Sequence, residues 1–252
     1  MSLPLTKIRV PGIKSVIGVM SGKGGVGKSF VAANLAVSLA KMGKKVGLLD
    51  ADITYPNAFK ILGITAKIAT TAENKLTPIN KWGVTVVSMA GLCATEDEAI
   101  MWRGPIISKI IQQMLKETAW GELDALIIDF PTGTNDSTFT ILQSFSVDGV
   151  IVVTTPQALS MMDARRAMNA ASFLRVPMVG VVENMRGEIF GEGGGNRLAD
   201  MYRTQFLGSI PLRKQIVSLC DQGTPAVLHL EELEMIFSRI SRTVLEKILA
   251  PM

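Results

Sequence analysis

Cysteine and histidine are scarce in this chain of 252 residues, which contains two cysteines and one histidine. Cys93 and Cys220 lie far apart and form no CxxC pair, so the sequence predicts neither a disulfide framework nor a cysteine metal site within one chain. His229 has no second metal ligand at a suitable spacing, and a serine hydrolase would have no other histidine for its triad. The scarcity of cysteine fits a reducing compartment, and we expect the protein in the cytoplasm.

Long apolar runs and a strong net charge are also missing. The longest apolar runs, such as Val150–Val153 and Ala125–Ile128, are far shorter than the roughly 18 residues that a membrane span needs. The segment Met1–Gly12 carries Pro4 and Pro11 and no continuous apolar stretch, so it does not resemble a signal peptide. The formal net charge is only +4, a weak basis for binding anionic surfaces. We therefore expect neither a membrane nor a nucleic acid as a partner.

The composition and the residue pattern favour a folded α/β core. Hydrophobic residues make up 48% and charged residues 19% of the chain, which is typical of a globular protein and excludes disorder. Short β-branched, apolar segments recur along the chain and alternate with longer stretches of helical spacing. The predicted strands are Ser15–Met20, Lys45–Asp50, Val84–Ser88, Ala125–Asp129, Gly149–Thr154 and Pro177–Val182. This alternation predicts a mostly parallel sheet with helices on both faces.

The same pattern predicts one domain. No Ser/Pro/Gly linker divides the chain, so we expect a single domain over residues 1–252, with residues 1–14 as an N-terminal arm. A helix is predicted over Ser29–Met42. The stretches Asp52–Trp82 and Arg186–Gly195 are predicted to be irregular and to face partners or to move.

A phosphate-binding loop is predicted between the first strand and the first helix. The segment Gly22–Ser29 reads GKGGVGKS and fits the GxxxxGK[ST] pattern in the strand–loop–helix setting that the motif requires. Glycines let backbone N–H groups surround phosphate oxygens, and the helix N-terminus adds the positive end of its dipole. We expect Lys28 to reach the β and γ phosphates of ATP and the Ser29 hydroxyl to bind Mg²⁺. The predicted nucleotide-binding residues of this segment are Gly22, Lys23, Gly24, Gly25, Val26, Gly27, Lys28, Ser29 and Phe30.

Three carboxylates are predicted at the carboxyl edge of the sheet, where α/β folds bind their ligands. Asp50 and Asp52 follow the second strand, and Asp129 ends a later one. Asp129 is the candidate Walker B carboxylate for Mg²⁺. Asp52 is the candidate that positions or deprotonates the attacking water, and with Ser29 and Asp129 it completes the predicted metal site. Asp50 is an alternative support of the Mg²⁺ shell.

The phosphate loop resembles the deviant Walker A motif of the MinD/ParA group of P-loop ATPases, because Lys23 directly follows its first glycine. Beyond the loop, the chain is similar over nearly its entire length to the Mrp/Nbp35 (ApbC) family of iron–sulfur cluster carrier ATPases. The segments that carry this resemblance are, in chain order, GLLDADI (47–53), WRGP (102–105), WGELDALIID (120–129), VTTPQ (153–157), DARRA (163–167), GVVENM (180–185), IFGEGGG (189–195) and FLGSIPL (206–212).

The resemblance implies a slow ATPase that works as a homodimer with ATP at its interface. It implies a role in assembling iron–sulfur clusters or transferring them to apoprotein clients. It also implies that Lys23 reaches the nucleotide of the partner subunit and stabilises charge on the transferring phosphoryl group, as an arginine finger does. Finally, it implies that Asn184 hydrogen-bonds adenine, for which its amide offers both a donor and an acceptor.

Two departures from the family pattern concern the cargo and the hydrolysis rate. In much of the family a CxxC that holds a bridging cluster falls between the ENM and IFGEGGG segments. Here Asn184–Met185 continues through Arg186–Glu188 directly into Ile189. Iron–sulfur clusters usually need thiolate ligands, so the sequence leaves cluster binding open. The family's switch sequence PPGTGD reads PTGTND over Pro131–Asp136, and Asn135 replaces a glycine.

Two other functions stay open at this stage. The missing CxxC favours a nucleotide-driven scaffold or chaperone that needs no cluster, with Cys93 and Cys220 as buried or incidental residues. A ParA/MinD-like positioning ATPase would need an amphipathic or basic surface. The C-terminal segment has an apolar stripe, but its other face carries four glutamates against three basic side chains, so we expect it to pack on the sheet. The stripe consists of Leu233, Ile236, Phe237, Ile240, Val244 and Ile248.

Overall fold

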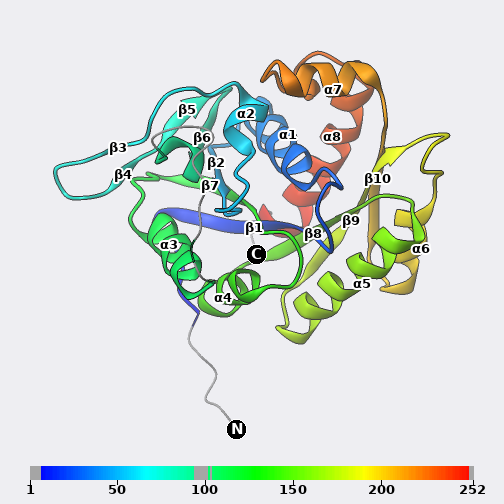
Figure 1. Cartoon of the computed structure of the whole chain (residues 1–252), viewed down its shortest axis with the longest axis horizontal. Coiled ribbons are helices and arrows are strands. Elements are labelled where there is room, and N and C mark those ends of the chain that lie inside the picture. Colours follow the sequence, from blue (N-terminus) through cyan, green and yellow to red (C-terminus); the bar gives the residue numbers. More distant parts are fainter. Residues whose placement is uncertain (1–6, 94–101, 103, 250–252) are drawn as a thin grey trace, which may run out of the picture.

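A computed structural model describes residues 7–93, 102 and 104–249 of the chain. Within these ranges eight strands form one sheet in the order β10-β9-β8-β1-β7-β2-β6-β5 (Figure 1). Neighbouring strands are parallel, except that β5 pairs with β6 in the antiparallel direction. The strands are β1 (Ile13–Ser21), β2 (Val46–Asp50), β5 (Ile79–Lys81), β6 (Val84–Ser88), β7 (Leu123–Asp129), β8 (Gly149–Thr154), β9 (Met178–Arg186) and β10 (Gln205–Pro211). The predicted mostly parallel sheet is confirmed.

Helices cover both faces of this sheet, as predicted. Figure 1 shows α1, α2, α7 and α8 on one face and α3, α4, α5 and α6 on the other. The helices are α1 (Lys28–Lys41), α2 (Ala58–Leu62), α3 (Gly104–Lys116), α4 (Asp136–Ser144), α5 (Ala158–Phe173), α6 (Gly194–Met201), α7 (Lys214–Asp221) and α8 (Glu231–Val244). Single turns at Met89–Gly91, Ala226–Leu228 and Leu245–Leu249 complete the helical elements of the described residues.

The helix that follows the phosphate loop is the most buried helix of the fold. In α1 even the side chains of Asn34 and Ser38 are buried, because α8 covers the side that faces away from the sheet. Phe30 and Phe237 meet edge to face with ring centroids 6.1 Å apart, and the Ser38 and Ser241 hydroxyls are 2.9 Å apart. The apolar stripe of the C-terminal segment therefore packs on α1 and on β10, which confirms that this helix belongs to the core.

Both stretches that the sequence predicts to be irregular contain regular structure. Residues 52–82 hold α2, the small hairpin of β3 (Ala69–Thr70) and β4 (Leu76–Thr77), and β5. These elements are too short for periodicity to reveal them. In the stretch 186–195, β9 continues to Arg186, a bridge joins Gly187 to Gly191, and α6 begins at Gly194.

The expected N-terminal arm is shorter than residues 1–14. Strand β1 begins at Ile13, and the Ile8 backbone already forms hydrogen bonds with Ser144, the last residue of α4, and with Ser146. Residues 1–6 of the arm, and Arg103 of the WRGP segment, lie outside the described residues. Across the described ranges, none of the helices has the length and apolar character that crossing a membrane requires.

Candidate functional site

The phosphate loop, the segment after β2 and the end of α7 surround a cavity of about 440 Å³. It lies at the carboxyl edge of the sheet, where β1 gives way to the loop and β2 and β7 end side by side. The residues that line it are Ser21, Lys23, Gly24, Gly25, Val26, Gly27, Lys28, Ser29, Phe30, Asp52, Tyr55, Asn57, Lys60, Ile61, Thr132, Cys220 and Asp221. The loop residues and Asp52 thus gather at one cavity.

Two glycines of the loop are needed because their neighbours approach too closely for a side chain. A Cβ atom on Gly22 would overlap the backbone of Asp163 in α5. A Cβ atom on Gly27 would overlap the Asn184 amide, and Gly27 also has a φ of 85°, which disfavours any other residue. The loop is therefore held between α5 at its start and β9 at its end.

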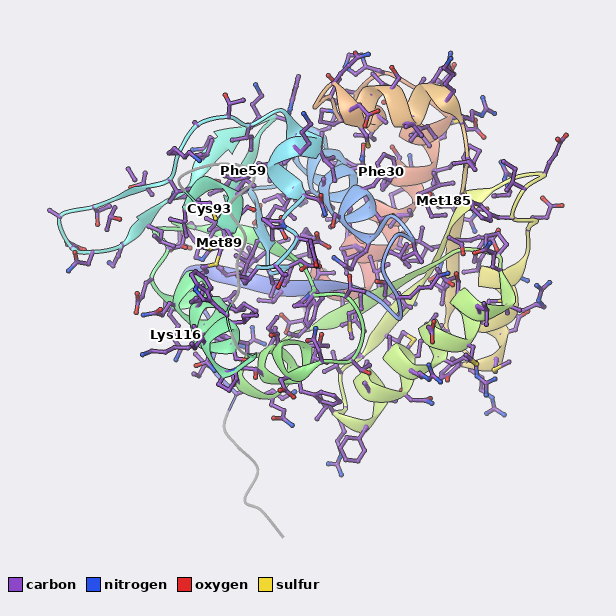
Figure 2. The ribbon with its side chains drawn as sticks, in the orientation of Figure 1. Phe30, Phe59, Met89, Cys93, Lys116 and Met185 are labelled. Carbon is purple, nitrogen blue, oxygen red and sulfur yellow. The ribbon has the colours of Figure 1, made fainter. Side chains whose placement is uncertain are left out.

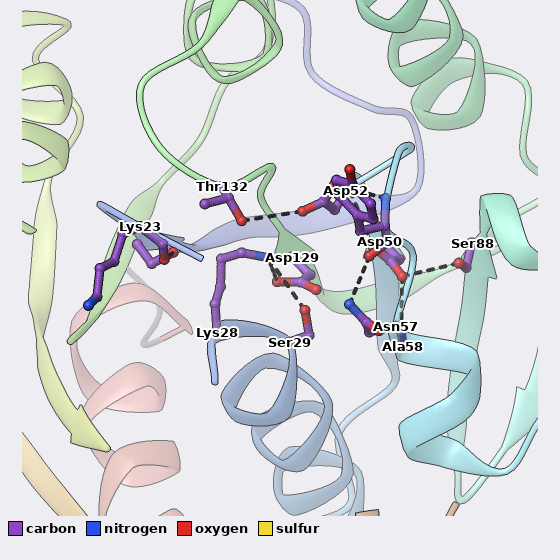
Figure 3. A network of polar contacts seen from close by, with 12 residues as sticks. Lys23, Lys28, Ser29, Asp50, Asp52, Asn57, Ala58, Ser88, Asp129 and Thr132 are labelled. Carbon is purple, nitrogen blue, oxygen red and sulfur yellow. Dashed lines mark hydrogen bonds and ion pairs between the residues drawn. The ribbon is translucent and has the colours of Figure 1, made fainter. Parts of the chain in front are cut away.

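A buried ion pair lies beneath the loop. The Lys28 Nζ atom is 2.5 Å from Asp129 Oδ1 and 3.5 Å from the Ser29 hydroxyl, and both charged side chains are at most 5% exposed (Figure 3). The second carboxylate oxygen of Asp129, Oδ2, is buried and has no hydrogen-bond partner. A buried carboxylate oxygen without a partner is costly unless something else binds it.

These side chains fit Mg²⁺. The unpartnered Asp129 oxygen and the Ser29 hydroxyl are hard oxygen donors of the kind that Mg²⁺ prefers, and Mg²⁺ commonly takes its other ligands from phosphates and water. Lys28 is the charge that a triphosphate would attract away from Asp129.

Asp50 is held differently from Asp52. Its carboxylate accepts hydrogen bonds from the Ala58 amide at 2.9 Å, the Ser88 hydroxyl at 3.1 Å and the Asp52 amide at 3.2 Å. Burial, with a smaller contribution from the neighbouring Asp129 charge, raises the pKa of Asp50 to about 7. Asp50 therefore fixes the start of α2 and the segment that carries Asp52.

Asp52 joins the segments that follow β2 and β7. Its carboxylate accepts hydrogen bonds from the Tyr55 amide at 3.3 Å and from the Thr132 hydroxyl at 3.4 Å (Figure 3). Burial raises the pKa of Asp52, while the Lys28 charge opposes that shift. Thr132 was not predicted as a site residue, although its place in the PTGTND segment was a usable signal.

Lys23 points away from this network. In Figure 3 its side chain extends to the side opposite Asp52, whereas Lys28 points toward Asp129. The backbone carbonyl of Lys23 accepts a hydrogen bond from the Ser21 hydroxyl at 3.1 Å, which fixes the start of the loop. The two lysines of the motif therefore point in different directions.

Asn184 contacts the end of the phosphate loop, and Phe30 lies in the first turn of α1. The Asn184 side chain is buried, and its Nδ2 donates a hydrogen bond to the Val26 carbonyl at 2.9 Å. Strand β9 runs two residues past Asn184, so the residue lies within the strand, whereas the predicted strand ended at Val182. Phe30 is 7% exposed and packs mainly on Phe237, with an edge at the cavity.

The remaining candidates lie in different surroundings. Cys93 is buried near Met89 and Phe59 (Figure 2), whereas Cys220 is half-buried at the cavity. Burial, and to a lesser degree Asp221, raises the pKa of the Cys220 thiol to about 11. Asn135, which replaces a family glycine, accepts a hydrogen bond from the Thr138 amide at 2.9 Å and caps α4.

Comparisons with known proteins identify the family and the fold of the chain. The profile of the ParA family, described as NUBPL iron-transfer P-loop NTPase, matches residues 12–249. An iron–sulfur cluster carrier protein of Deinococcus radiodurans is 44% identical over 234 residues, which cover 88% of this chain and 66% of that protein. The chain thus spans just under two thirds of the length of that relative.

Solved structures show the same fold. A nucleotide-binding protein of Archaeoglobus fulgidus in complex with ADP superposes with a TM-score of 0.76 at 36% identity, covering 89% of this chain and 93% of that one. The septum site-determining protein MinD of Pyrococcus horikoshii, complexed with Mg-ADP, superposes with a TM-score of 0.70 at 24% identity, covering 91% and 95%. The latter likeness concerns the fold alone.

Proposed function

This chain belongs to the family of iron-transfer P-loop NTPases, and from that premise we propose that it binds and hydrolyses ATP to drive the assembly or transfer of iron–sulfur clusters. One observation carries the nucleotide part of the proposal. It is the buried Lys28–Asp129 pair with an unpartnered carboxylate oxygen directly beneath a phosphate loop. We further propose that the chain works as one ATPase domain in the cytoplasm.

The side chains divide the work between binding and hydrolysis. Lys28 leaves Asp129 to bind the β and γ phosphates, and the amides of the loop residues Gly24–Ser29 surround the phosphate oxygens. Ser29, Asp129 and Asp52 hold Mg²⁺, which neutralises phosphate charge when it is bound. Asp52 accepts a hydrogen bond from the attacking water and orients it, because it lies on the same cavity as Lys28 and is fixed by Thr132.

Lys23 is proposed to act on a second subunit. Its side chain points away from Asp129 and Asp52 of its own subunit, so it is free to reach a nucleotide across a homodimer interface. There it would stabilise the charge of the transferring phosphoryl group. Closure of such a dimer around ATP would couple hydrolysis to the binding and release of apoprotein clients.

The cluster is the cargo in this proposal, and its ligands are the open part. The family's CxxC insertion after Met185 is missing, and Cys93 is buried. Cys220 lines the nucleotide cavity, where the raised pKa of its thiol opposes the thiolate form that iron needs.

Substitution of Lys28 tests the nucleotide half. We expect Lys28→Ala to lower ATP affinity and the rate of hydrolysis by at least about 100-fold, because it removes the phosphate ligand and leaves Asp129 unpaired. Nucleotide binding by calorimetry and phosphate release measure both effects. Lys44→Ala, in the loop that follows α1, is the matched control and should match the wild type. Intact hydrolysis in Lys28→Ala would refute the proposal.

Anaerobic reconstitution with iron and sulfide tests the cargo half. Bound iron and absorbance are measured for the wild type, Cys93→Ala and Cys220→Ala. A cluster that disappears with a cysteine substitution supports a carrier with an unusual ligand set. If the protein hydrolyses ATP but binds no iron, the carrier hypothesis is wrong and a nucleotide-driven scaffold is the better explanation.

A further inference from the structure

A buried glutamate next to Asn184 has no part in the proposed hydrolysis. Glu183 is 1% exposed and lies in β9. Its carboxylate accepts three hydrogen bonds: from the Gly195 amide at 2.8 Å, the Gly193 amide at 3.2 Å and the Ser209 hydroxyl at 2.9 Å. A charged side chain that is buried and bonded three times fixes its own backbone firmly.

The backbone that Glu183 fixes changes direction at once. Met185 has a φ of 60°, a conformation that residues with a side chain rarely adopt, and it lies inside a strand (Figure 2). The pairing with β10 shifts register between Ser209 and Pro211, opposite the same point. This bulge lets Asn184 and Met185 both approach the phosphate loop, as bulges beside active sites commonly do.

The contact between Asn184 and the phosphate loop leaves no free space between them. The Asn184 amide occupies the space that a Cβ atom of Gly27 would fill, and its Nδ2 donates to the Val26 carbonyl at 2.9 Å. A shift of β9 by about 1 Å would break that hydrogen bond. The bond also fixes the amide's orientation, so one N–H and the Oδ1 atom stay available. A purine that presents a donor beside an acceptor, as adenine does with N6 and N7, matches this pair, whereas guanine presents two acceptors there.

We propose that Glu183 is a positioning residue that sets the preference of this site for adenine over guanine nucleotides. It acts through Asn184: the carboxylate clamps β9 to Gly193, Gly195 and Ser209, and the clamp holds the Asn184 amide against the loop. The inference rests on the proposed nucleotide binding and adds the residue that makes it selective. Gly195 fits the same picture, because a Cβ atom there would lie 2.7 Å from the Glu183 Cβ atom.

Calorimetric titration with Mg²⁺ and ATP, GTP or inorganic tripolyphosphate tests the inference. We expect the wild type to prefer ATP, and Asn184→Ala to reduce the ATP-over-GTP preference about tenfold. Glu183→Gln removes one acceptor and should reduce the preference about fivefold. Both variants should keep their affinity for tripolyphosphate within about twofold, because the loop's phosphate contacts remain. Loss of tripolyphosphate binding together with the preference would mean a merely structural role and would overturn the inference.

A double-substitution cycle separates positioning from independent effects. If Glu183 acts through Asn184, then Glu183→Gln combined with Asn184→Ala should have the same preference as Asn184→Ala alone, within about twofold. Multiplied effects would contradict the mechanism. Ser209→Ala, which removes one of the three donors, should shift the preference in the same direction by about twofold, and it serves if Glu183→Gln does not fold. Glu188→Gln, an exposed change in the following loop, should have no effect.

The outcomes also separate this inference from the function on which it rests. If the wild type binds neither ATP nor tripolyphosphate, the proposed function fails. If the wild type binds ATP without preference, or if Glu183→Gln keeps the full preference, only the role of Glu183 fails.

Discussion

The phosphate loop and the loop that follows β9 are both rich in glycine, but Gly22 and Gly27 of the first loop and Gly187 and Gly191 of the second have opposite surroundings. Gly22 and Gly27 leave no room for a side chain, because α5 and Asn184 press against them. Gly187 and Gly191 have no other heavy atom within 4 Å of the position that a Cβ would occupy. The two ends of the phosphate loop must therefore keep one backbone shape, although Gly25 between them is open, whereas the segment from Gly187 to Gly191 has room for sequence change.

The phosphate loop and the loop after β9 also differ in charge and in exposure. The phosphate loop covers the buried Lys28–Asp129 pair. The loop after β9 exposes Glu188 and Glu192, and Ile189 is 79% exposed. This second loop is also where the family's cysteine-bearing insertion is absent from the chain. The proposed nucleotide site is thus under tight geometric control, and it lies next to a loop whose geometry leaves the proposed cargo function room to diverge.

The largest effect is expected at the buried centre of the first region. Asp129→Asn keeps the shape of the side chain but removes the counter-charge of Lys28 and a predicted Mg²⁺ ligand, so ATP hydrolysis should fall roughly 1000-fold. Phosphate release under saturating ATP measures the loss. Asp124→Asn, at the other end of β7, removes the charge that pairs with the exposed Lys14 and keeps an oxygen that can accept from the Lys45 amide, so it should leave hydrolysis unchanged. Equal rates of hydrolysis in both variants would show that Asp129 takes no part in the reaction.

A matched pair of glycine substitutions tests the comparison itself. Gly27 and Gly191 have φ values of 85° and 78°, so alanine strains both backbones alike. Only at Gly27 does the new methyl group also overlap Asn184. We expect Gly27→Ala to weaken ATP binding by at least about 100-fold and Gly191→Ala by less than about twofold, measured by calorimetry. Similar losses would show that crowding does not distinguish the two loops.

The sequence predicted the first region well because each signal there is local. The strand–loop–helix pattern placed Gly22–Ser29, and strand-end position placed Asp50, Asp52 and Asp129 at one edge of the sheet. The different surroundings of the three carboxylates could not be predicted from the sequence. It depends on Ser88 and Ala58, which reach Asp50 only through tertiary packing.

The contacts of Glu183 and the bulge at Met185, both in β9 just before the second loop, could not be predicted from the sequence for a physical reason. The clamp on Glu183 joins residues 10 to 26 positions away through backbone amides and a hydroxyl, and backbone donors carry no sequence signature. The bulge at Met185 also leaves no signal in the sequence, because methionine has no preference for a positive φ. Family resemblance pointed to Asn184, but only the packing shows what holds it.

The reactivity of Cys220 sharpens the contrast at the edge of the nucleotide cavity. A pKa raised from 9.0 to about 11 lowers the thiolate fraction about 100-fold, and the higher nucleophilicity of such a thiolate offsets part of this. We expect alkylation by iodoacetamide at pH 8 to be roughly tenfold slower than for a small free thiol, as followed by mass spectrometry. Asp221→Asn should raise the rate. A rate equal to that of the free thiol would reopen Cys220 as a cluster ligand.

The smallest effect is a dependence of stability on pH that comes from Asp50, at the end of β2. Burial raises the pKa of Asp50 to about 7 from its ordinary value of 3.8, so the folded state holds this proton more tightly than the unfolded state does. As pH rises from about 4 to 7, the unfolded state releases its proton first, and Asp50 makes folding progressively less favourable. The melting temperature of the wild type relative to Asp50→Asn should therefore decline by a few degrees over this range, in calorimetric scans. Glu188→Gln, an exposed change in the loop after β9, is the control and should give a curve parallel to that of the wild type. A difference between wild type and Asp50→Asn that stayed constant from pH 4 to 7 would mean that Asp50 is ionised throughout, and that its three hydrogen bonds outweigh its burial.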